Sequence, residues 1–209
     1  MSLNIDTFVL GEISNNTYLI WDEETGEAAV IDPSFNPQPI IRAIKQKGLI
    51  LTGVWLTHGH FDHFIGIPEI ISAFGATPVY LHPADHDMYL TGGLGSNFGF
   101  LVPFLPPASS LPDDWNFFLG KSKINIFETP GHSKGHVVYY AESISTVFTG
   151  DLIFKLSVGR TDLPGADQDL LLKSIYEKIL TLPEMTRILP GHNEATTIAD
   201  EVEYNPYLN

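Results

Sequence analysis

Residues 57–63 of this chain read THGHFDH, which places three histidines and one aspartate within seven positions. Folding does not require such a cluster, because buried polar side chains cost free energy unless they find partners. His58 and His60 alternate as they would at the end of an extended strand, so both rings should point to one side. Asp62 and His63 follow where the chain should turn into a helix, and there they can face a second metal ion. Histidine nitrogen and aspartate oxygen suit zinc, so the stretch predicts a metal site.

Four short β-prone segments each end just before a polar residue that such a site could use. They are 54–57 before His58, 124–129 before Pro130-Gly131-His132, 146–149 before Gly150-Asp151, and 187–189 before Pro190-Gly191-His192. Strands that end together at one rim of a sheet would bring all four groups to one place, where α/β scaffolds usually bind ligands. Each group alone is a weak signal, but their joint order favours a shared site.

The same motifs resemble those of the metallo-β-lactamase superfamily, and most closely its glyoxalase II-like branch. Residues 57–63 match the family's T-H-x-H-x-D-H signature completely, and similar elements follow at 130–136, 149–151 and 189–192. The resemblance covers nearly the whole chain. It implies an α/β fold, a four-layer αββα sandwich formed as a single domain over residues 1–209, with metals bound at one edge between two sheets.

The resemblance also implies the roles of individual side chains. One metal ion would be bound by His58, His60 and His132, the other by Asp62, His63 and His192, and Asp151 would bridge the two. A pair of divalent ions lowers the pKa of a bridging water and so provides a hydroxide nucleophile near pH 7. We expect two zinc ions, with iron or manganese as alternatives, and we expect Asp62 and Asp151 to be essential for catalysis.

Four further polar residues near these motifs have less certain roles. His136 lies in a matching motif but not at a ligand position, so a structural or supporting role is expected. His82 and His86 match no motif and are interpreted as ordinary loop histidines. Asp32 follows the apolar run 28–31, where it either orients a metal ligand through a hydrogen bond or serves the fold alone.

Two basic residues, Lys155 and Arg160, are candidates for substrate binding. They lie in the segment 154–162, and in glyoxalase II-like proteins the corresponding segment carries a basic residue that holds a substrate carboxylate. Arg160 is the matching position, and a guanidinium suits bidentate carboxylate recognition. A salt bridge from Arg160 to Asp162 or Asp167 is an equally good interpretation.

The sequence departs from glyoxalase II in two ways. It ends soon after His192, without the helical C-terminal extension that completes glutathione recognition, and Asp162 replaces an aromatic residue expected two positions after the basic one. The resemblance therefore implies hydrolysis of a small-molecule thioester with a carboxylate, as in compact bacterial glyoxalase II-like hydrolases, without implying glutathione specificity.

The main alternative is a persulfide dioxygenase with a single iron. Such enzymes resemble the chain too, including the Gly-Arg-Thr-Asp stretch at 159–162, with His58, His132 and Asp151 as the matching ligands. The complete second ligand set favours two metals. A lactonase, a nuclease and a β-lactamase are less favoured, the last because no export signal is present. An inactive metal-binding module is also disfavoured, because it should have lost ligands.

The composition excludes several classes of protein. The 209 residues include no cysteine, which excludes disulfides, thiolate ligands and cysteine nucleophiles. A formal net charge of −14, without any run of Lys and Arg, counts against a nucleic-acid partner. No apolar stretch approaches the roughly 20 residues of a membrane span, and the N-terminus does not read as a secretory signal. We therefore expect a cytoplasmic protein that does not bind membranes.

The pattern between the motifs predicts the remaining secondary structure. Two strands, 17–21 and 28–31, should form a hairpin. Apolar residues at helical spacing predict three helices, at 39–47, 62–74 and 167–180. Asp167 is the predicted N-cap of the third helix. Residues 86–120 are rich in Gly, Pro and aromatic residues, and so long an irregular segment is usually a functional cover or partly structured.

Overall fold

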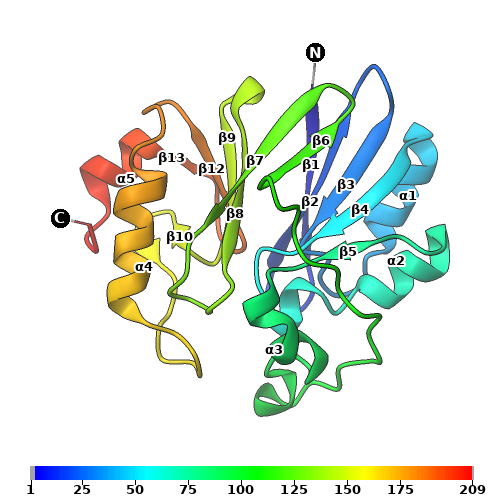
Figure 1. The fold of residues 1–209 in the computed structure, drawn as a ribbon, viewed down its shortest axis with the longest axis horizontal. Coiled ribbons are helices and arrows are strands. Elements are labelled where there is room, and N and C mark those ends of the chain that lie inside the picture. The colour runs from blue at the N-terminus through cyan, green and yellow to red at the C-terminus, as the bar shows by residue number, and fades with distance from the viewer. Residues whose placement is uncertain (1–2, 209) are drawn as a thin grey trace.

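Two β-sheets pack face to face, and helices cover the outer side of each (Figure 1). The computed structural model describes residues 3–208, so Met1, Ser2 and Asn209 of the domain predicted over 1–209 lie outside the described residues. The first sheet has the order β1-β2-β3-β4-β5, with β1 (Leu3–Leu10), β2 (Asn15–Asp22), β3 (Glu27–Ile31), β4 (Ile50–Trp55) and β5 (Val79–Tyr80).

The second sheet has the order β13-β12-β9-β8-β7-β6. Its strands are β6 (Asn116–Leu119), β7 (Ser122–Glu128), β8 (Val137–Ala141), β9 (Thr146–Gly150), β12 (Arg187–Pro190) and β13 (Thr196–Thr197). A separate two-stranded ribbon pairs β10 (Ile153–Phe154) with β11 (Ser157–Val158).

Helices α1 (Gln38–Lys47) and α2 (Ile67–Phe74) cover the first sheet, and α4 (Gln168–Ser174) and α5 (Ile198–Tyr204) cover the second (Figure 1). The last turn of α4 continues as a π-helical turn, Ile175–Ile179. Helix α3 (His86–Leu90) lies in the segment that follows β5. Within residues 3–208, no helix is at once long and apolar enough to cross a membrane.

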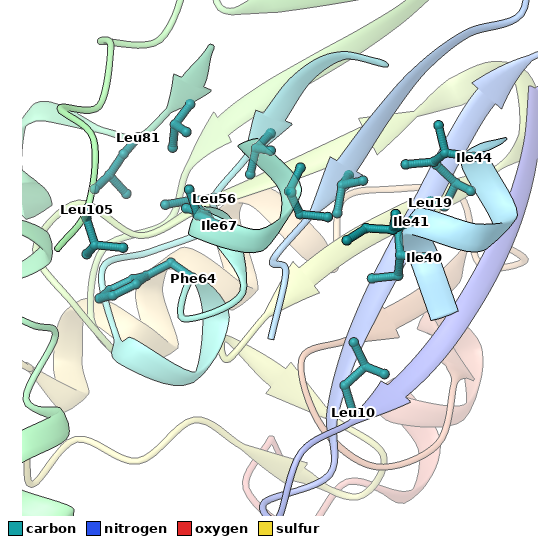
Figure 2. Packing of buried hydrophobic residues seen from close by; sticks show 14 of the residues in the cluster. Leu10, Leu19, Ile40, Ile41, Ile44, Leu56, Phe64, Ile67, Leu81 and Leu105 are labelled. Carbon is teal, nitrogen blue, oxygen red and sulfur yellow. The ribbon is translucent and has the colours of Figure 1, made fainter. Parts of the chain in front are cut away.

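Three apolar clusters hold the four layers together, because successive residues of a strand point to opposite faces of its sheet. Leu19 of β2 faces the helices of the first sheet, whereas its neighbours Tyr18 and Ile20 are buried between the two sheets. Figure 2 shows the outer cluster, in which Ile40 and Ile44 of α1 lie near Leu19. A third cluster joins the second sheet to α4 and α5. Each fully buried aliphatic side chain of this kind contributes about 1.5–3 kcal/mol.

The predicted αββα sandwich is confirmed, together with most of its predicted elements. Strands β2 and β3 form the expected antiparallel hairpin. Helix α1 matches the helix predicted at 39–47. The helix predicted at 167–180 is present, and the Asp167 side chain caps it by accepting a hydrogen bond from the backbone N–H of Leu170 at 3.0 Å.

We expected the four motif-bearing strands to end at the rim of one sheet, but they belong to two sheets. Strand β4 belongs to the first sheet, while β7, β9 and β12 belong to the second. Strands β7 and β9 each pair antiparallel with β8, and β12 pairs parallel with β9, so all three run in the same direction. A backbone hydrogen bond of 2.8 Å from Val137 N–H to the Thr57 carbonyl joins the two sheets where the motifs meet. The groups therefore converge at an edge shared by both sheets.

The helix predicted at 62–74 begins five residues later than expected. Residues 61–63 form a short 3-10 turn, and α2 starts only at Ile67. The cause is Gly66, whose backbone N–H donates to the Pro33 carbonyl at 3.0 Å. A Cβ at this position would lie 2.2 Å from the Ser34 carbonyl oxygen. This contact pins the chain against the first sheet and holds the 3-10 turn apart from the helix.

Residues 86–120 contain more regular structure than the sequence indicated. They include α3, a 3-10 turn at 95–98 and strand β6, which pairs antiparallel with β7 at the sheet edge. Phe117 of β6 stacks on Trp55 of β4 with ring centroids 4.4 Å apart. These long-range contacts, which no local pattern reveals, order the strand.

Candidate metal centre

All seven predicted metal ligands meet at the shared edge of the two sheets. They form three overlapping groups in which the candidate ligand atoms lie within 4.8 Å of one another: His58, His60 and His132; His58, His63 and Asp151; and Asp62, His63 and His192. The first and third groups match the two predicted sets. The middle group joins them through Asp151.

Distances between side-chain atoms place Asp151 between the two sets. Its Oδ1 lies 3.4 Å from His63 Nε2, and its Oδ2 lies 3.7 Å from both His132 Nε2 and His192 Nε2. Within the second set, the Asp62 Oδ2 lies 3.2 Å from His192 Nε2. Asp151 is thus the residue that both sets can share, which is the position expected of a bridging ligand.

Four of the histidines are held by a hydrogen bond through the ring nitrogen that faces away from the centre. The pairs are His58 Nδ1 with Thr57 Oγ1 at 3.0 Å, His63 Nδ1 with Asp32 Oδ2 at 2.9 Å, His132 Nδ1 with the Arg160 carbonyl at 2.9 Å, and His192 Nδ1 with the Ile13 carbonyl at 3.2 Å. Such a bond fixes the tautomer, so that the other nitrogen keeps a lone pair for a metal.

Asp32 connects two of these hydrogen bonds. Besides His63, its carboxylate accepts from the Thr57 backbone N–H at 2.8 Å and from the Thr57 hydroxyl at 2.7 Å. The hydroxyl proton is used in this way, so the Thr57 oxygen accepts from the N–H of His58. Of the two roles that the sequence left open for Asp32, the hydrogen bond to a candidate ligand is present.

Burial sets the protonation of two histidines in the first set, His58 and His60. It lowers the pKa of His58 well below the ordinary value, and it lowers the pKa of His60 to about 3, with a further contribution from the neighbouring His132. Both rings are therefore neutral and able to donate a lone pair. The buried Nε2 of His58 has no hydrogen-bond partner within the described part of the chain.

The second set contains carboxylates that remain ionised. Burial alone would raise the pKa values of Asp62 and Asp151, but the charges of nearby histidines, His63 first, hold both below the usual range. Burial would likewise lower the pKa of His63, yet Asp62, Asp151 and Asp32 together raise it well above the ordinary value. The buried Asp151 Oδ1 lacks a hydrogen-bond partner among residues 3–208. The neutral rings of His58 and His60, beside ionised carboxylates with free oxygen lone pairs, fit divalent cations.

A cavity of about 430 Å³ opens onto this centre. Five candidate ligands form one wall: His60, Asp62, His132, Asp151 and His192. An aromatic wall of the same cavity includes the apolar side chains Phe61, Leu94, Phe98 and Phe100. The Phe61 ring centroid lies 4.9 Å from that of Phe100 and 6.0 Å from that of Phe98. Leu94, Phe98 and Phe100 belong to the segment 86–120, so this segment contributes to the lining of the cavity.

The structure separates the two basic residues predicted to bind substrate. Arg160 lines the cavity, where its guanidinium holds Asp162 with two hydrogen bonds of 2.7 Å. Lys155 is not among the lining residues and pairs with Glu194 on the surface. Of the two, only Arg160 lines the cavity.

The three remaining histidines of the sequence analysis lie outside the candidate metal groups. His136 is buried, its Nδ1 lies 2.9 Å from the Thr129 hydroxyl, and its ring stacks on His58 at 5.2 Å, as suits a supporting role. His82 pairs with Glu128, and His86 bonds the Leu81 carbonyl.

Sequence reasoning missed three buried polar residues around the centre. The Asn15 side-chain amide lies 3.1 Å from His63 Nε2, and the Asn16 amide donates to the carbonyls of Pro190 and Asn193 beside His192. Asp85 accepts hydrogen bonds from two of the ligand-bearing loops. Two adjacent asparagines before a predicted strand were a weak signal. Asp85 had none, because its partners are far away in the sequence.

A family model described as the metallo-beta-lactamase superfamily matches residues 10–192, a range that contains the entire centre. The chain belongs to this superfamily. The probable metallo-hydrolase YqgX of Bacillus subtilis is 36% identical to it over 203 residues, which cover 96% of this chain and 95% of the relative. The hydroxyacylglutathione hydrolase GloC of Haemophilus influenzae is 33% identical over 217 residues, which cover 99% of each chain.

Solved structures of other superfamily members have the same fold along their full length. The BLEG-1 B3 metallo-β-lactamase superposes with a TM-score of 0.91 at 35% identity, covering 99% of this chain and all of that one. TTHA1623, solved in a di-iron-bound form, superposes with a TM-score of 0.87 at 36% identity, covering 97% of this chain and all of that one. This metallo-β-lactamase superfamily protein is therefore of the metallo-hydrolase class, which binds divalent metal ions.

Proposed function

We propose that this superfamily member hydrolyses a small-molecule thioester, using two divalent metal ions held by the seven converging side chains. The observation that carries the proposal is the pair of complete ligand groups joined by Asp151, five of whose side chains line one cavity. Zinc is the first candidate metal because all ligand atoms are imidazole nitrogen or carboxylate oxygen, and iron or manganese are the alternatives. Two such ions supply a hydroxide nucleophile near neutral pH and polarise a scissile carbonyl.

The chain's own residues position the reactants. Asp62 and Asp151 present ionised oxygens to the centre, and the carbonyl of Arg160 holds the His132 ring in place. The aromatic wall of Phe61, Phe98 and Phe100 gives the same cavity an apolar lining. A substrate between these walls would have its carbonyl at the ligands and its apolar part against the rings.

Thioesters are favoured as substrates by the relative named hydroxyacylglutathione hydrolase, which spans the same length. A carboxylate on the substrate is favoured by Arg160. Its present partner, Asp162, is exposed, and exposed ion pairs are worth only about 0–1 kcal/mol. A substrate carboxylate can therefore replace Asp162 on the guanidinium at little cost.

The test is metal analysis of the purified protein together with turnover assays. We expect about two metal ions per chain, the number that the paired ligand sets would hold, and hydrolysis of lactoylglutathione or another thioester that stops when the metal is removed. Each other outcome rejects the proposal in a specific way. One iron per chain with oxygen uptake on a persulfide would indicate a dioxygenase. Faster turnover of a β-lactam or a lactone would reassign the substrate, and a metal-free protein with full activity would reject the metal centre.

A further inference from the structure

Asp85 is a buried carboxylate whose partners lie on two separate loops of the centre. Only 1% of its surface is exposed. Its Oδ2 accepts from the Gly59 backbone N–H at 3.0 Å and from the Ser133 hydroxyl at 2.6 Å, and its Oδ1 accepts from the Gly135 backbone N–H at 2.7 Å. Within residues 3–208, no Lys or Arg forms an ion pair with it. A buried carboxylate without a cation depends on such donors to remain favourable.

The two loops carry the three histidines of the first ligand set. Gly59 lies between His58 and His60, at the end of β4 in the first sheet. Ser133 and Gly135 follow His132, in the connection from β7 to β8 of the second sheet. Asp85 therefore ties together, from outside the candidate metal groups, two turns that belong to different sheets.

The loops fit closely around Asp85. A Cβ on Gly59 would lie 3.1 Å from the Asp85 carbonyl oxygen, and a Cβ on Gly135 would lie 2.9 Å from its carboxyl carbon. Glycine at both positions allows the backbone N–H groups to approach the carboxylate directly. A change in the length or charge of residue 85 would be transmitted straight to the two turns.

We propose that Asp85 is a positioning residue for the first metal site, where it sets the distance between the His58–His60 turn and the His132 turn. This inference rests on the proposed two-metal function. It predicts a site-selective effect, because the second set uses Asp62, His63 and His192, none of which borders a residue bonded to the Asp85 carboxylate. A residue that served only overall stability would affect both sets alike.

The selectivity can be measured with Asp85→Asn in two backgrounds of the full chain. His192→Ala disables the second set, and His60→Ala disables the first. Each protein is stripped of metal and titrated with zinc against a chromophoric chelator. The asparagine has the same shape but can accept at one oxygen only. We expect it to weaken zinc binding about tenfold or more in the His192→Ala background, as loss of a supporting hydrogen bond does. In the His60→Ala background we expect a change of less than about twofold.

Asp87→Asn is the matched control, because Asp87 is exposed on α3 and, within residues 3–208, its side chain forms no hydrogen bond with either loop. It should change neither affinity. If Asp85→Asn does not fold, as thermal unfolding of the metal-free protein would reveal, Ser133→Ala replaces it. Loss of that single hydroxyl should weaken zinc binding about threefold, a fraction of the full effect, in the His192→Ala background alone.

Two outcomes would overturn the inference while leaving the proposed function standing. One is an equal loss of affinity in both backgrounds, and the other is unchanged affinity in the His192→Ala background. A wild-type chain that binds no zinc, iron or manganese would instead reject the proposed function itself, so the two failures are distinguishable.

Discussion

The two walls of the cavity differ in how firmly their side chains are held. On the ligand wall, His132 and His192 each have the outward ring nitrogen in a hydrogen bond to a backbone carbonyl. On the aromatic wall, Phe98 keeps 47% of its surface exposed and is held by ring contacts alone among its described interactions. Directional bonds fix an atom to a fraction of an ångström, whereas ring packing tolerates sliding. Reaction chemistry should therefore depend on the first wall and substrate choice on the second.

The largest expected effect comes from the residue that joins the two ligand sets. Asp151→Ala should lower kcat/KM by about a thousandfold or more, because several kcal/mol of transition-state stabilisation depend on the metals it holds. Turnover assays and circular dichroism should show lost activity with the fold retained. Asp169→Ala, an exposed aspartate on α4, is the control and should behave as wild type. Near-normal activity of Asp151→Ala would defeat the assignment of the ligand wall.

The next largest effect should follow removal of the metal, which should lower the free energy of unfolding. A ligand at about one hundred times its Kd stabilises the folded state by about 2.7 kcal/mol. In a protein of this size that corresponds to a Tm shift of about 5–11 °C. Thermal unfolding with and without a chelator measures the shift, and added zinc should restore it. An unchanged Tm would mean that the ligand wall is equally stable without metal.

Replacing Arg160 should raise KM moderately, whereas replacing Lys155 should not. Arg160→Ala is expected to raise KM about tenfold for a thioester with a carboxylate, since a charge-assisted hydrogen bond is worth about 1.5 kcal/mol or more. Lys155→Ala should change it less than about twofold, because exposed ion pairs contribute little. The matching thioester without a carboxylate tests the cause. If both variants affect both substrates equally, the guanidinium is not a carboxylate site.

The smallest effect is expected at the aromatic wall. Phe98→Ala should lower kcat/KM about fivefold for substrates with a large apolar group, because a half-exposed ring contributes about 1 kcal/mol of contact. Small substrates should be unaffected, and metal content should stay the same. Measuring a series of acyl chain lengths sharpens the comparison between the walls. A loss of metal in this variant would show that the two walls are not independent.

The sequence predicted the ligand wall well, because each ligand lies within a short motif at a strand end. The role of Asp32 could also be predicted, since this residue directly follows a predicted strand. The residues that support the ligands from other parts of the chain could not be predicted. Asn15 and Asp85 reach the centre only after the sheets pack, so Asn15 has only a weak local signal and Asp85 has none. The start of α2 was misjudged for the same reason, because Gly66 is held by Pro33 rather than by its own neighbours.

The backbone pairing of Asn16 with Gly191 affects the order in which the two ligand sets can assemble during synthesis. The backbone N–H of Asn16 donates a hydrogen bond of 2.7 Å to the carbonyl of Gly191, which follows much later in the chain. The nascent chain can assemble His58, His60 and His132 early, since N-terminal parts of a chain fold first during synthesis. His192 is synthesised after all the other candidate ligands. A ribosome-stalled fragment that stops before His192 should thus capture one ion, whereas a chain that includes His192 should capture two.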